Sequence, residues 1–327
     1  MFKRVIGLLA LFILLLSSYS HAQTMDNKGK QIVLVVVPSF SFQEAEWLWV
    51  EGMERSLWEH ASLGAMNVRP AGSYSYLNNT VTLSIGDKAT GVDGWNSFER
   101  TEEIEGFPAW QMMLQLTGAL PAGELLHPYF ERLKQANQQE IGQLGELLAR
   151  AGIDCEVFGH SDTDRKKIRY ASLFTLNQVG EGKGSLVQSV KRERQSAFGM
   201  EMDEHKLLNR LGNRQLQNER SFTVVEWGDL HRLYEEKERI AANRFEQERS
   251  KQLRRLEQFI NKAVDIVDGD VWLLAPMMHR EAYGSKEQLA PFYQWGQKDG
   301  GFLTSATTRR PYLISNLDFF SDAAHSI

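Results

Sequence analysis

Five ionisable side chains lie in short segments that directly follow apolar runs of the sequence: Asp162, Glu226, Asp229, His231 and His279. Carboxylates and imidazoles are the ligands with which many hydrolases hold Zn²⁺ and related ions. Segments that follow the strands of a parallel sheet meet at one edge of that sheet. The sequence therefore allows a shared site for Zn²⁺ or Mn²⁺ built from these five residues.

Most of these residues also have a simpler structural interpretation. Asp162 stands between Ser161 and Thr163, where an aspartate commonly closes a turn through its side chain. Asp229 precedes an expected helix whose free amides its carboxylate can cap. His231 and His279 are isolated histidines of loop segments. Since such roles are common, the favoured expectation is that the protein needs no metal and no other cofactor.

Other catalytic groups have no matching pattern. The sequence contains no Gly-x-Ser-x-Gly turn and no glycine-rich phosphate loop of either standard spacing. The single cysteine, Cys155, falls at an inward position of an alternating segment, so a thiol nucleophile is not expected and no internal disulfide can form. A net charge of -5 argues against a nucleic-acid-binding surface, which would be basic.

The elements that must position these groups are strands, and the clearest of them spans residues 31–37. Its unbroken run of β-branched residues and leucine is typical of a strand with helices on both of its faces. Strand and helix patterns alternate along the chain. These patterns predict an α/β fold with a largely parallel sheet and helices on both faces.

The domain organisation follows from composition. Residues 1–22 have the basic start, apolar run and Ser-His-Ala end of a cleaved secretory signal peptide, which predicts a secreted or cell-envelope location. Residues 23–30 form a polar linker, residues 31–318 a single domain, and residues 319–327 a tail. Insertions are expected near 90–128 and 191–220.

Three local expectations come from residue patterns within the domain. Residues 43–60 carry apolar residues at helical spacing and predict one helix. The polar and aromatic segment 73–82 predicts a loop. The apolar segment 171–176 predicts another strand.

Several segments together resemble the alkaline phosphatase superfamily, which includes sulfatases and cofactor-independent phosphoglycerate mutases. The similarity is strongest to a divergent bacterial branch of alkaline-phosphatase-like proteins. It rests on segments in order along the chain: 35–37, 64–69, 83–86, 145–152 with Gly-His-Ser-Asp-Thr at 159–163, 226–230 and 301–311. Members of the superfamily usually continue beyond the strand that here spans 312–317. The resemblance therefore leaves open an incomplete sheet and a truncated chain.

The resemblance also shows where this chain departs from active members, which use an early aspartate, a hydroxyl nucleophile at a helix start, and several later aspartates and histidines. The matching positions hold Pro38 (or, less directly, Ser39), Asn78, Leu230, Pro276 with Met277, and Arg310. Ser75 and Thr80 are displaced hydroxyl candidates for the nucleophile, and His231 is one residue out of register. The divalent metal ions of the active members need several anionic or imidazole ligands. The resemblance therefore implies that this chain has the fold without its usual metal centre.

These departures favour an exported alkaline-phosphatase-like domain that acts as a binding or envelope-associated module. The alternative is a metal-dependent hydrolase of phosphate or sulfate esters that uses the five rearranged residues. Arg69 and Arg310, with Arg309 beside the latter, are candidates for binding an anionic small molecule, because guanidinium groups match phosphate and carboxylate oxygens. The other expected partner class is an envelope component.

Overall fold

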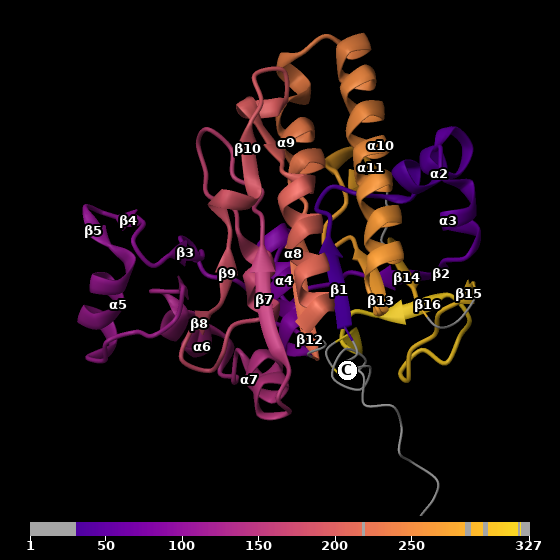
Figure 1. Cartoon of the computed structure of the whole chain (residues 1–327). Helices are drawn as coiled ribbons and strands as arrows, with labels where there is room; N and C mark the ends of the chain where they lie inside the picture. The colour runs from indigo at the N-terminus through magenta and orange to yellow at the C-terminus, as the bar shows by residue number, and fades with distance from the viewer. Residues whose placement is uncertain (1–30, 218–219, 285–288, 297–299, 320, 322–327) are drawn as a thin grey trace, which may run out of the picture.

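The computed structural model describes residues 31–217, 220–284, 289–296, 300–319 and 321. The expected signal peptide and linker lie outside these residues, as does most of the expected tail. Within the described part of the chain, the core is a nine-stranded sheet in the order β15-β2-β14-β13-β1-β12-β7-β9, with β16 also paired to β2 (Figure 1). Its strands are β1 (Gln31–Val36), β2 (Ser62–Asn67), β7 (Asp154–Phe158), β9 (Gly184–Ser185), β12 (Ser221–Glu226), β13 (Gly269–Leu274), β14 (Leu289–Trp295), β15 (Gly301–Phe302) and β16 (Leu313–Ser315).

Strand β1 lies in the middle of this sheet and is buried along its whole length. It pairs in parallel with β12 on one side and β13 on the other, so that Val33 lies opposite both Thr223 and Val271. An apolar side chain at every position is what a strand covered on both faces requires. The prediction of a central buried strand from residues 31–37 is confirmed.

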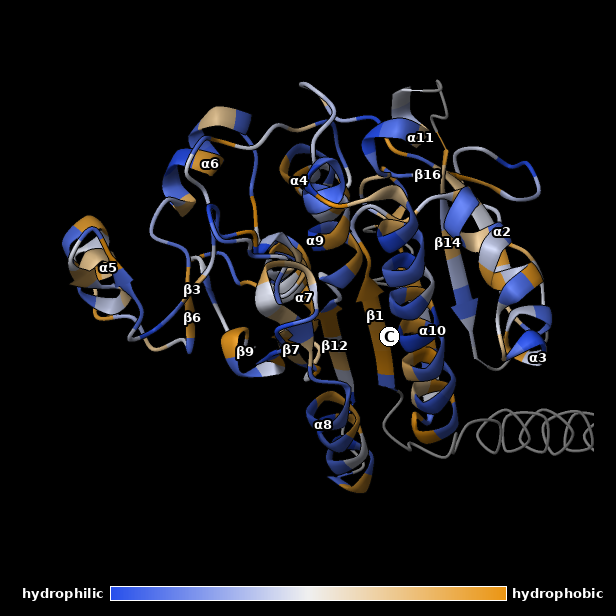
Figure 2. Cartoon of the chain, turned by 90° about the horizontal axis from the view of Figure 1, so that it is seen from above, coloured by the Kyte–Doolittle hydropathy of each residue, from blue (hydrophilic) through white to orange (hydrophobic). Residues whose placement is uncertain are grey.

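The sheet is largely parallel, as expected. The pairs β12–β7, β7–β9, β15–β2 and β16–β2 are parallel, whereas β14 runs antiparallel to both of its neighbours. Helices cover both faces, with α8 and α10 in front of the sheet and α4 and α7 behind it (Figures 1 and 2). The central strands are apolar, whereas the outer helix faces are largely hydrophilic (Figure 2).

The helices are α2 (Phe42–Glu51), α3 (Arg55–Glu59), α4 (Tyr76–Ile85), α5 (Ala109–Thr117), α6 (Phe130–Asn137), α7 (Gln143–Arg150), α8 (Glu204–Gln217), α9 (Asp229–Glu236), α10 (Ala242–Ile266) and α11 (Arg280–Gly284). Short 3₁₀ helices span Tyr170–Phe174 (η1), Val187–Ser189 (η2), Ala197–Gly199 (η3) and Lys237–Arg239 (η4). Among the helices of the described residues, none combines the length and the hydropathy that a membrane span requires.

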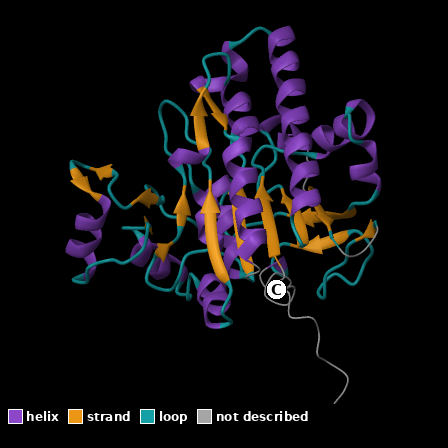
Figure 3. Cartoon of the chain, viewed as in Figure 1, coloured by secondary structure: helices purple, strands orange, loops and turns teal. Residues whose placement is uncertain are grey.

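Within the described residues, neither segment expected as an insertion contributes a strand to the main sheet (Figure 3). Residues 98–126 build a small lobe from β3 (Phe98–Glu99), β4 (Glu103–Ile104), β5 (Phe107–Pro108), α5 and β6 (Leu125–Leu126), to which β8 (Glu181–Gly182) pairs. This lobe has an apolar cluster of its own that includes Ile104 and Met113. The second segment contains the hairpin of β10 (Val190–Arg192) and β11 (Met200–Met202), followed by α8.

The single helix expected over residues 43–60 is instead two helices, α2 and α3. Helix α2 ends where Gly52 adopts an extended conformation. The next two amides, of Met53 and Glu54, donate to the carboxylate of Glu257 on α10 at 2.9 and 3.3 Å. A long-range carboxylate therefore takes over the amides that a continuous helix would use, and local periodicity cannot reveal such a partner.

The loop expected over residues 73–82 was a wrong prediction, because most of this segment is helix α4. Ser75 caps its first turn by accepting a hydrogen bond from the Asn78 amide at 3.2 Å. Polar side chains made the segment look like a loop, yet they are buried and bonded to backbone. Thr80 donates to the Tyr76 carbonyl at 2.8 Å, and Asn79 donates to the Pro276 carbonyl at 2.8 Å.

The strand expected over residues 171–176 was also wrong, because this segment belongs to the buried 3₁₀ helix η1 and the turn after it. A short apolar run is consistent with either a buried strand or a buried helical turn, and periodicity does not separate the two.

The burial of β1 generates a stability prediction. Leu34 is fully buried, so Leu34→Ala leaves a cavity and is expected to lower the free energy of unfolding by about 2–5 kcal/mol. Urea unfolding followed by circular dichroism measures the change. The matched control is Leu216→Ala on α8, where the side chain is 84% exposed and the expected change is within about 0.5 kcal/mol. Equal losses in the two variants would contradict the central position of β1.

Candidate functional site

The first strand-end residue with a functional side chain is Ser39, which lies two residues after the buried run. Its φ of 71° is in the left-handed region that non-glycine residues rarely adopt. The conformation is held by the Ser39 amide, which donates to the Met277 carbonyl at 2.6 Å. It places the Ser39 Oγ 3.1 Å from Nδ1 of His231, near the start of α9. The structure thus pairs a serine and a histidine just beyond the carboxyl end of β1.

His279 belongs to a separate buried cluster around the start of α2. Its Nε2 lies 3.2 Å from the Ser41 Oγ and 3.4 Å from a carboxylate oxygen of Glu44. The other Glu44 oxygen accepts a hydrogen bond from the Tyr234 hydroxyl at 2.6 Å. The Tyr234 ring stacks on the His279 ring at 4.3 Å. Since Ser41 and Glu44 also form the capping box of α2, this cluster fixes the helix start.

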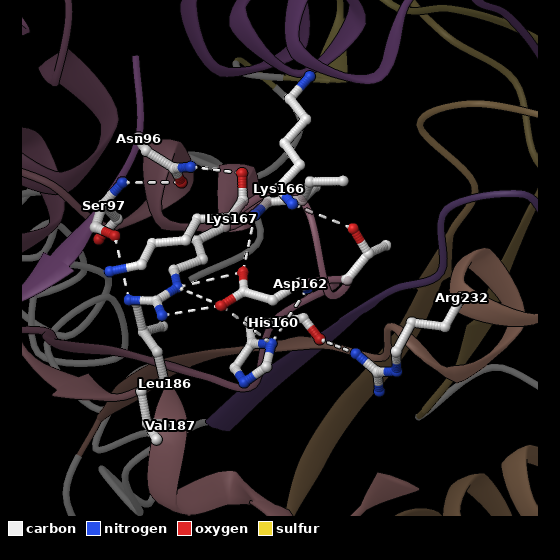
Figure 4. A network of polar contacts seen from close by, with 12 residues as sticks. Asn96, Ser97, His160, Asp162, Lys166, Lys167, Leu186, Val187 and Arg232 are labelled. Carbon is white, nitrogen blue, oxygen red and sulfur yellow. Dashed lines mark hydrogen bonds and ion pairs between the residues drawn. The ribbon is translucent and has the colours of Figure 1, made fainter. Parts of the chain in front are cut away.

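Asp162 follows β7 and is held by an arginine (Figure 4). Both of its oxygens accept hydrogen bonds from Arg169, with contacts from 2.8 to 3.2 Å. One oxygen also accepts from the Ile168 amide at 2.7 Å, so Asp162 closes the loop as its turn interpretation suggested. Arg169 in turn binds Glu102 of the lobe, which ties the lobe to the strand-end loop.

Asp229 is neutralised in the same manner. Its carboxylate accepts hydrogen bonds from Arg232 at 2.5 Å, from Arg255 of α10 at 2.7 Å and from the Met202 amide at 3.0 Å. Asp229 is the first residue of α9 rather than its cap, and the structure gives this helix no side-chain cap. Its role is to join α9, α10 and β11.

Glu226, the last residue of β12, has no guanidinium partner among the described residues. One oxygen accepts a hydrogen bond from the Ala171 amide at 2.9 Å, whereas the other has no hydrogen-bond partner. Burial raises its pKa to about 7, against a smaller opposing effect of the nearby Ser161 and Tyr76 hydroxyls. Both hydroxyls lie close to this carboxyl, yet neither makes a hydrogen bond of normal geometry with it.

A pocket of about 780 Å³ opens beside this group of residues. Its wall includes Tyr76, Tyr170, Trp95 and His231, which are all buried but border the pocket. Ser75 also lines the pocket at the start of α4, whereas Thr80 is fully buried inside the same helix. A second pocket of about 730 Å³ contains Ser39 and His279 and shares Glu235 and Met277 with the first.

The five residues expected as metal ligands are distributed over different contacts. No group of three or more His, Cys, Asp or Glu side chains within the described residues is arranged to hold a metal ion. Asp162 and Asp229 are bound by arginines, and His279 lies in the helix-capping cluster. Of the five residues, Glu226 and His231 each keep one side-chain atom without a hydrogen-bond partner in the described part of the chain, Oε1 and Nε2 respectively. Two unpartnered donor atoms do not by themselves make a site for a divalent ion, which needs several anionic or imidazole ligands.

The arginines expected to bind an anion lie away from both strand-end pockets. Arg69 follows β2 and Arg310 precedes β16; both side chains are exposed, and neither they nor Arg309 line the two pockets. The cations that border the first pocket are Arg165, Lys166 and Lys167.

Sequence reasoning missed the aromatic wall and these three cations. The run Arg165-Lys166-Lys167 three residues beyond Asp162 was a visible signal, since consecutive cations after a strand-end loop point toward an anionic partner. Tyr76, Trp95 and Tyr170 carry no such signal, because aromatic residues are more often simply part of a core.

The sequence matches no protein-family model and no curated protein. Among solved structures, the fold is similar to a protein in the alkaline phosphatase superfamily from Vibrio parahaemolyticus, with 13% identity and a TM-score of 0.50 over 89% of this chain and 64% of that one. The lipoteichoic acid synthase LtaP from Listeria monocytogenes has 14% identity and a TM-score of 0.40 over 90% of this chain and 70% of that one. Alkaline phosphatase from the Antarctic bacterium TAB5 has 9% identity and a TM-score of 0.45 over 91% of this chain and 98% of that one.

The chain therefore has an alkaline-phosphatase-like fold, as the resemblance in sequence predicted. It spans less than two thirds of the length of the Vibrio parahaemolyticus protein, and this likeness concerns the fold alone. What the chain does must be argued from its own side chains.

The buried Glu226 carboxyl predicts a pH dependence of stability. Its pKa is raised from 4.5 to about 7 by folding, so its contribution to stability is complete below pH 4.5 and is lost as the pH rises through 7. Relative to Glu226→Gln, wild-type protein is expected to lose about 3 kcal/mol of unfolding free energy over this range. Urea titrations at several pH values measure it, with the exposed Glu46→Gln as control. Parallel pH profiles of wild type and Glu226→Gln would contradict the raised pKa.

The Asp162–Arg169 pair predicts a different response. Arg169→Met leaves the buried Asp162 carboxylate without its main counter-charge and is expected to lower the free energy of unfolding by about 3–5 kcal/mol. The double variant Asp162→Asn/Arg169→Met is expected to recover part of that loss, because it removes the buried charge as well. If Arg169→Met lowers the free energy of unfolding by less than about 1 kcal/mol, which is the range of exposed ion pairs, the Asp162–Arg169 pair does not stabilise the fold as expected.

Proposed function

We propose that this protein is an exported, metal-independent binding domain with an alkaline-phosphatase-like fold, and that its ligand occupies the pocket beside Tyr76 and His231. The observation that carries the proposal is the neutralisation of the strand-end aspartates. Arg169 holds Asp162, while Arg232 and Arg255 hold Asp229. A carboxylate whose lone pairs accept hydrogen bonds from buried guanidinium groups is not available as a metal ligand unless those ion pairs break.

Export is supported by the signal-peptide pattern of residues 1–22. The structural neighbours include the C-terminal periplasmic domain of EcEptC from Escherichia coli.

The second candidate function is hydrolysis of phosphate or sulfate esters at a rearranged site with Zn²⁺ or Mn²⁺. It is favoured by one observation: Ser75 stands at the start of α4 and lines the pocket, which matches the superfamily's nucleophile at a helix start. Glu226 Oε1 and His231 Nε2 would be its remaining free ligands. Ser75 Oγ accepts a hydrogen bond from the Asn78 amide, so Ser75 caps α4 whether or not the protein is a hydrolase.

The two functions are separated by metal content and turnover of the purified protein. We expect substoichiometric metal by elemental analysis, and hydrolysis of p-nitrophenyl phosphate and p-nitrophenyl sulfate equal to the buffer rate with added Zn²⁺ or Mn²⁺. Ser75→Ala and Glu226→Gln are the variants to compare. Stoichiometric metal, together with a turnover that Ser75→Ala abolishes, would overturn metal-independent binding and establish the hydrolase.

A further inference from the structure

Two side chains that line the first pocket each carry a buried nitrogen with no hydrogen-bond partner in the described part of the chain. The two nitrogens are Nε2 of His231 and Nε1 of Trp95. Trp95 is 1% exposed and His231 4% exposed. Leaving a buried polar group unpaired costs about 1–3 kcal/mol, so a folded protein rarely leaves two such groups beside one pocket unless a ligand or water bonds to them.

The contact with Ser39 bears on the tautomer of His231, and so on whether its Nε2 donates or accepts a hydrogen bond. The contact of Ser39 Oγ with Nδ1 of His231 is the one hydrogen bond of that hydroxyl among the described residues. If the hydroxyl donates its proton to Nδ1, the neutral imidazole must carry its own proton on Nε2. Burial, with smaller contributions from Arg232 and Lys166, lowers the pKa of His231 to about 3, so the ring is neutral at ordinary pH. Nε2 is then a hydrogen-bond donor without an acceptor.

The charges that border the pocket are three cations and two acids. Lys167 is paired with Glu102, and Arg165 lies 3.9 Å from Asp164. Lys166 makes no ion pair among the described residues, and it lies close enough to His231 to lower its pKa. Its side chain extends away from Asp162 (Figure 4). The acids Asp93 and Glu235 also border the pocket.

The wall between the two unpaired nitrogens is a row of aromatic rings. His231 contacts Tyr76 at 6.2 Å, Tyr76 contacts Tyr170 at 5.1 Å, and Tyr170 contacts Trp95 at 6.0 Å between ring centres. A volume of about 780 Å³ is far larger than an inorganic ion needs and lies within the range of organic-ligand pockets. The donors at the two ends of this row therefore suit one organic molecule better than a free ion.

We propose that this pocket is a metal-free receptor for an organic oxyanion, bound through the Nε2–H of His231 and the ammonium group of Lys166. The negative group is a carboxylate or a phosphate, and the organic part extends along the aromatic row toward the Trp95 indole. Ser39 is a positioning residue, because it fixes the proton of His231 on Nε2. This inference rests on the proposed function, since it names the ligand class of the same pocket.

The test uses the exported chain in buffer with EDTA, titrated calorimetrically with phenylphosphonate, benzoate, inorganic phosphate and neutral benzyl alcohol. We expect phenylphosphonate or benzoate to bind, and the stronger of the two identifies the anionic group. Inorganic phosphate is expected to bind more weakly and benzyl alcohol not measurably. The ¹⁵N–¹H signal of the Trp95 indole, assigned with Trp95→Phe, is expected to shift during the titration.

Matched variants localise the binding. Lys166→Gln and His231→Leu are each expected to weaken it about tenfold or more, as loss of a charged or buried hydrogen bond implies. Lys166→Arg and Lys262→Gln, the latter on the exposed surface of α10, are expected to bind as wild type does. Ser39→Ala is expected to weaken binding and to change the imidazole ¹⁵N shifts of His231 toward a mixture of tautomers.

Two results would overturn the receptor. One is the absence of binding by both organic anions in a folded protein, and the other is binding that Lys166→Gln and His231→Leu leave unchanged. Unchanged imidazole shifts in Ser39→Ala would overturn the positioning role of Ser39 alone. Binding that requires added Zn²⁺ would contradict both the receptor and the proposed metal-independent function. If neither anion binds in the absence of metal, only the receptor is overturned, because the metal content and turnover of the protein test the proposed function separately.

Discussion

Charge buried at the carboxyl ends of the parallel strands must be neutralised where it lies, and the arrangement of the site depends on this constraint. An ionised carboxylate removed from water is tolerated only with a counter-charge and hydrogen bonds around it. Arginines supply both for Asp162 and Asp229, and they reach the strand ends from the residue before η1, from α9 and from α10. The same contacts fasten the lobe and the long helix to the sheet. Interactions that stabilise the fold thus occupy carboxylates that a metal centre would need.

Among these strand-end carboxylates, Glu226 is the one without an arginine partner in the described part of the chain, and its pKa is raised. Glu226 shares its buried space with hydroxyls and aromatic rings, so it retains its proton up to a pH of about 7. The Ala171 amide is its hydrogen-bond donor, the Ser161 and Tyr76 hydroxyls lie near it, and the negative charge of Asp162 helps to keep its pKa raised. A pocket next to such a group is suited to recognising a ligand by donors such as His231 and by a cation at its rim. The strand ends therefore carry aspartates held by arginines and, apart from them, one carboxyl with a raised pKa.

Local sequence patterns predicted the elements well where burial alone decides them. The unbroken apolar run of β1 and the alternation of strands with helices sufficed for the α/β class and for a largely parallel sheet. Patterns failed where a distant partner decides. Glu257 ends α2 by accepting the amides after Gly52, and buried polar residues of α4 bond to backbone although they resemble a loop. Of the site, sequence pointed to His231 and Glu226, and it gave no sign of the aromatic wall.

The sequence by itself determined the fold class, because the alternation of apolar strand patterns with helical patterns depends only on residue type and order. Only the tertiary structure decided which side chains meet. Arg169 and Asp162 lie close in the chain, yet Arg255 reaches Asp229 from a different helix, and Ser39 reaches His231 across 192 positions. Such contacts depend on the register of parallel strands that are far apart in sequence. That register brings Ser39, His231 and Tyr76 to the same edge of the sheet, and no local pattern encodes it.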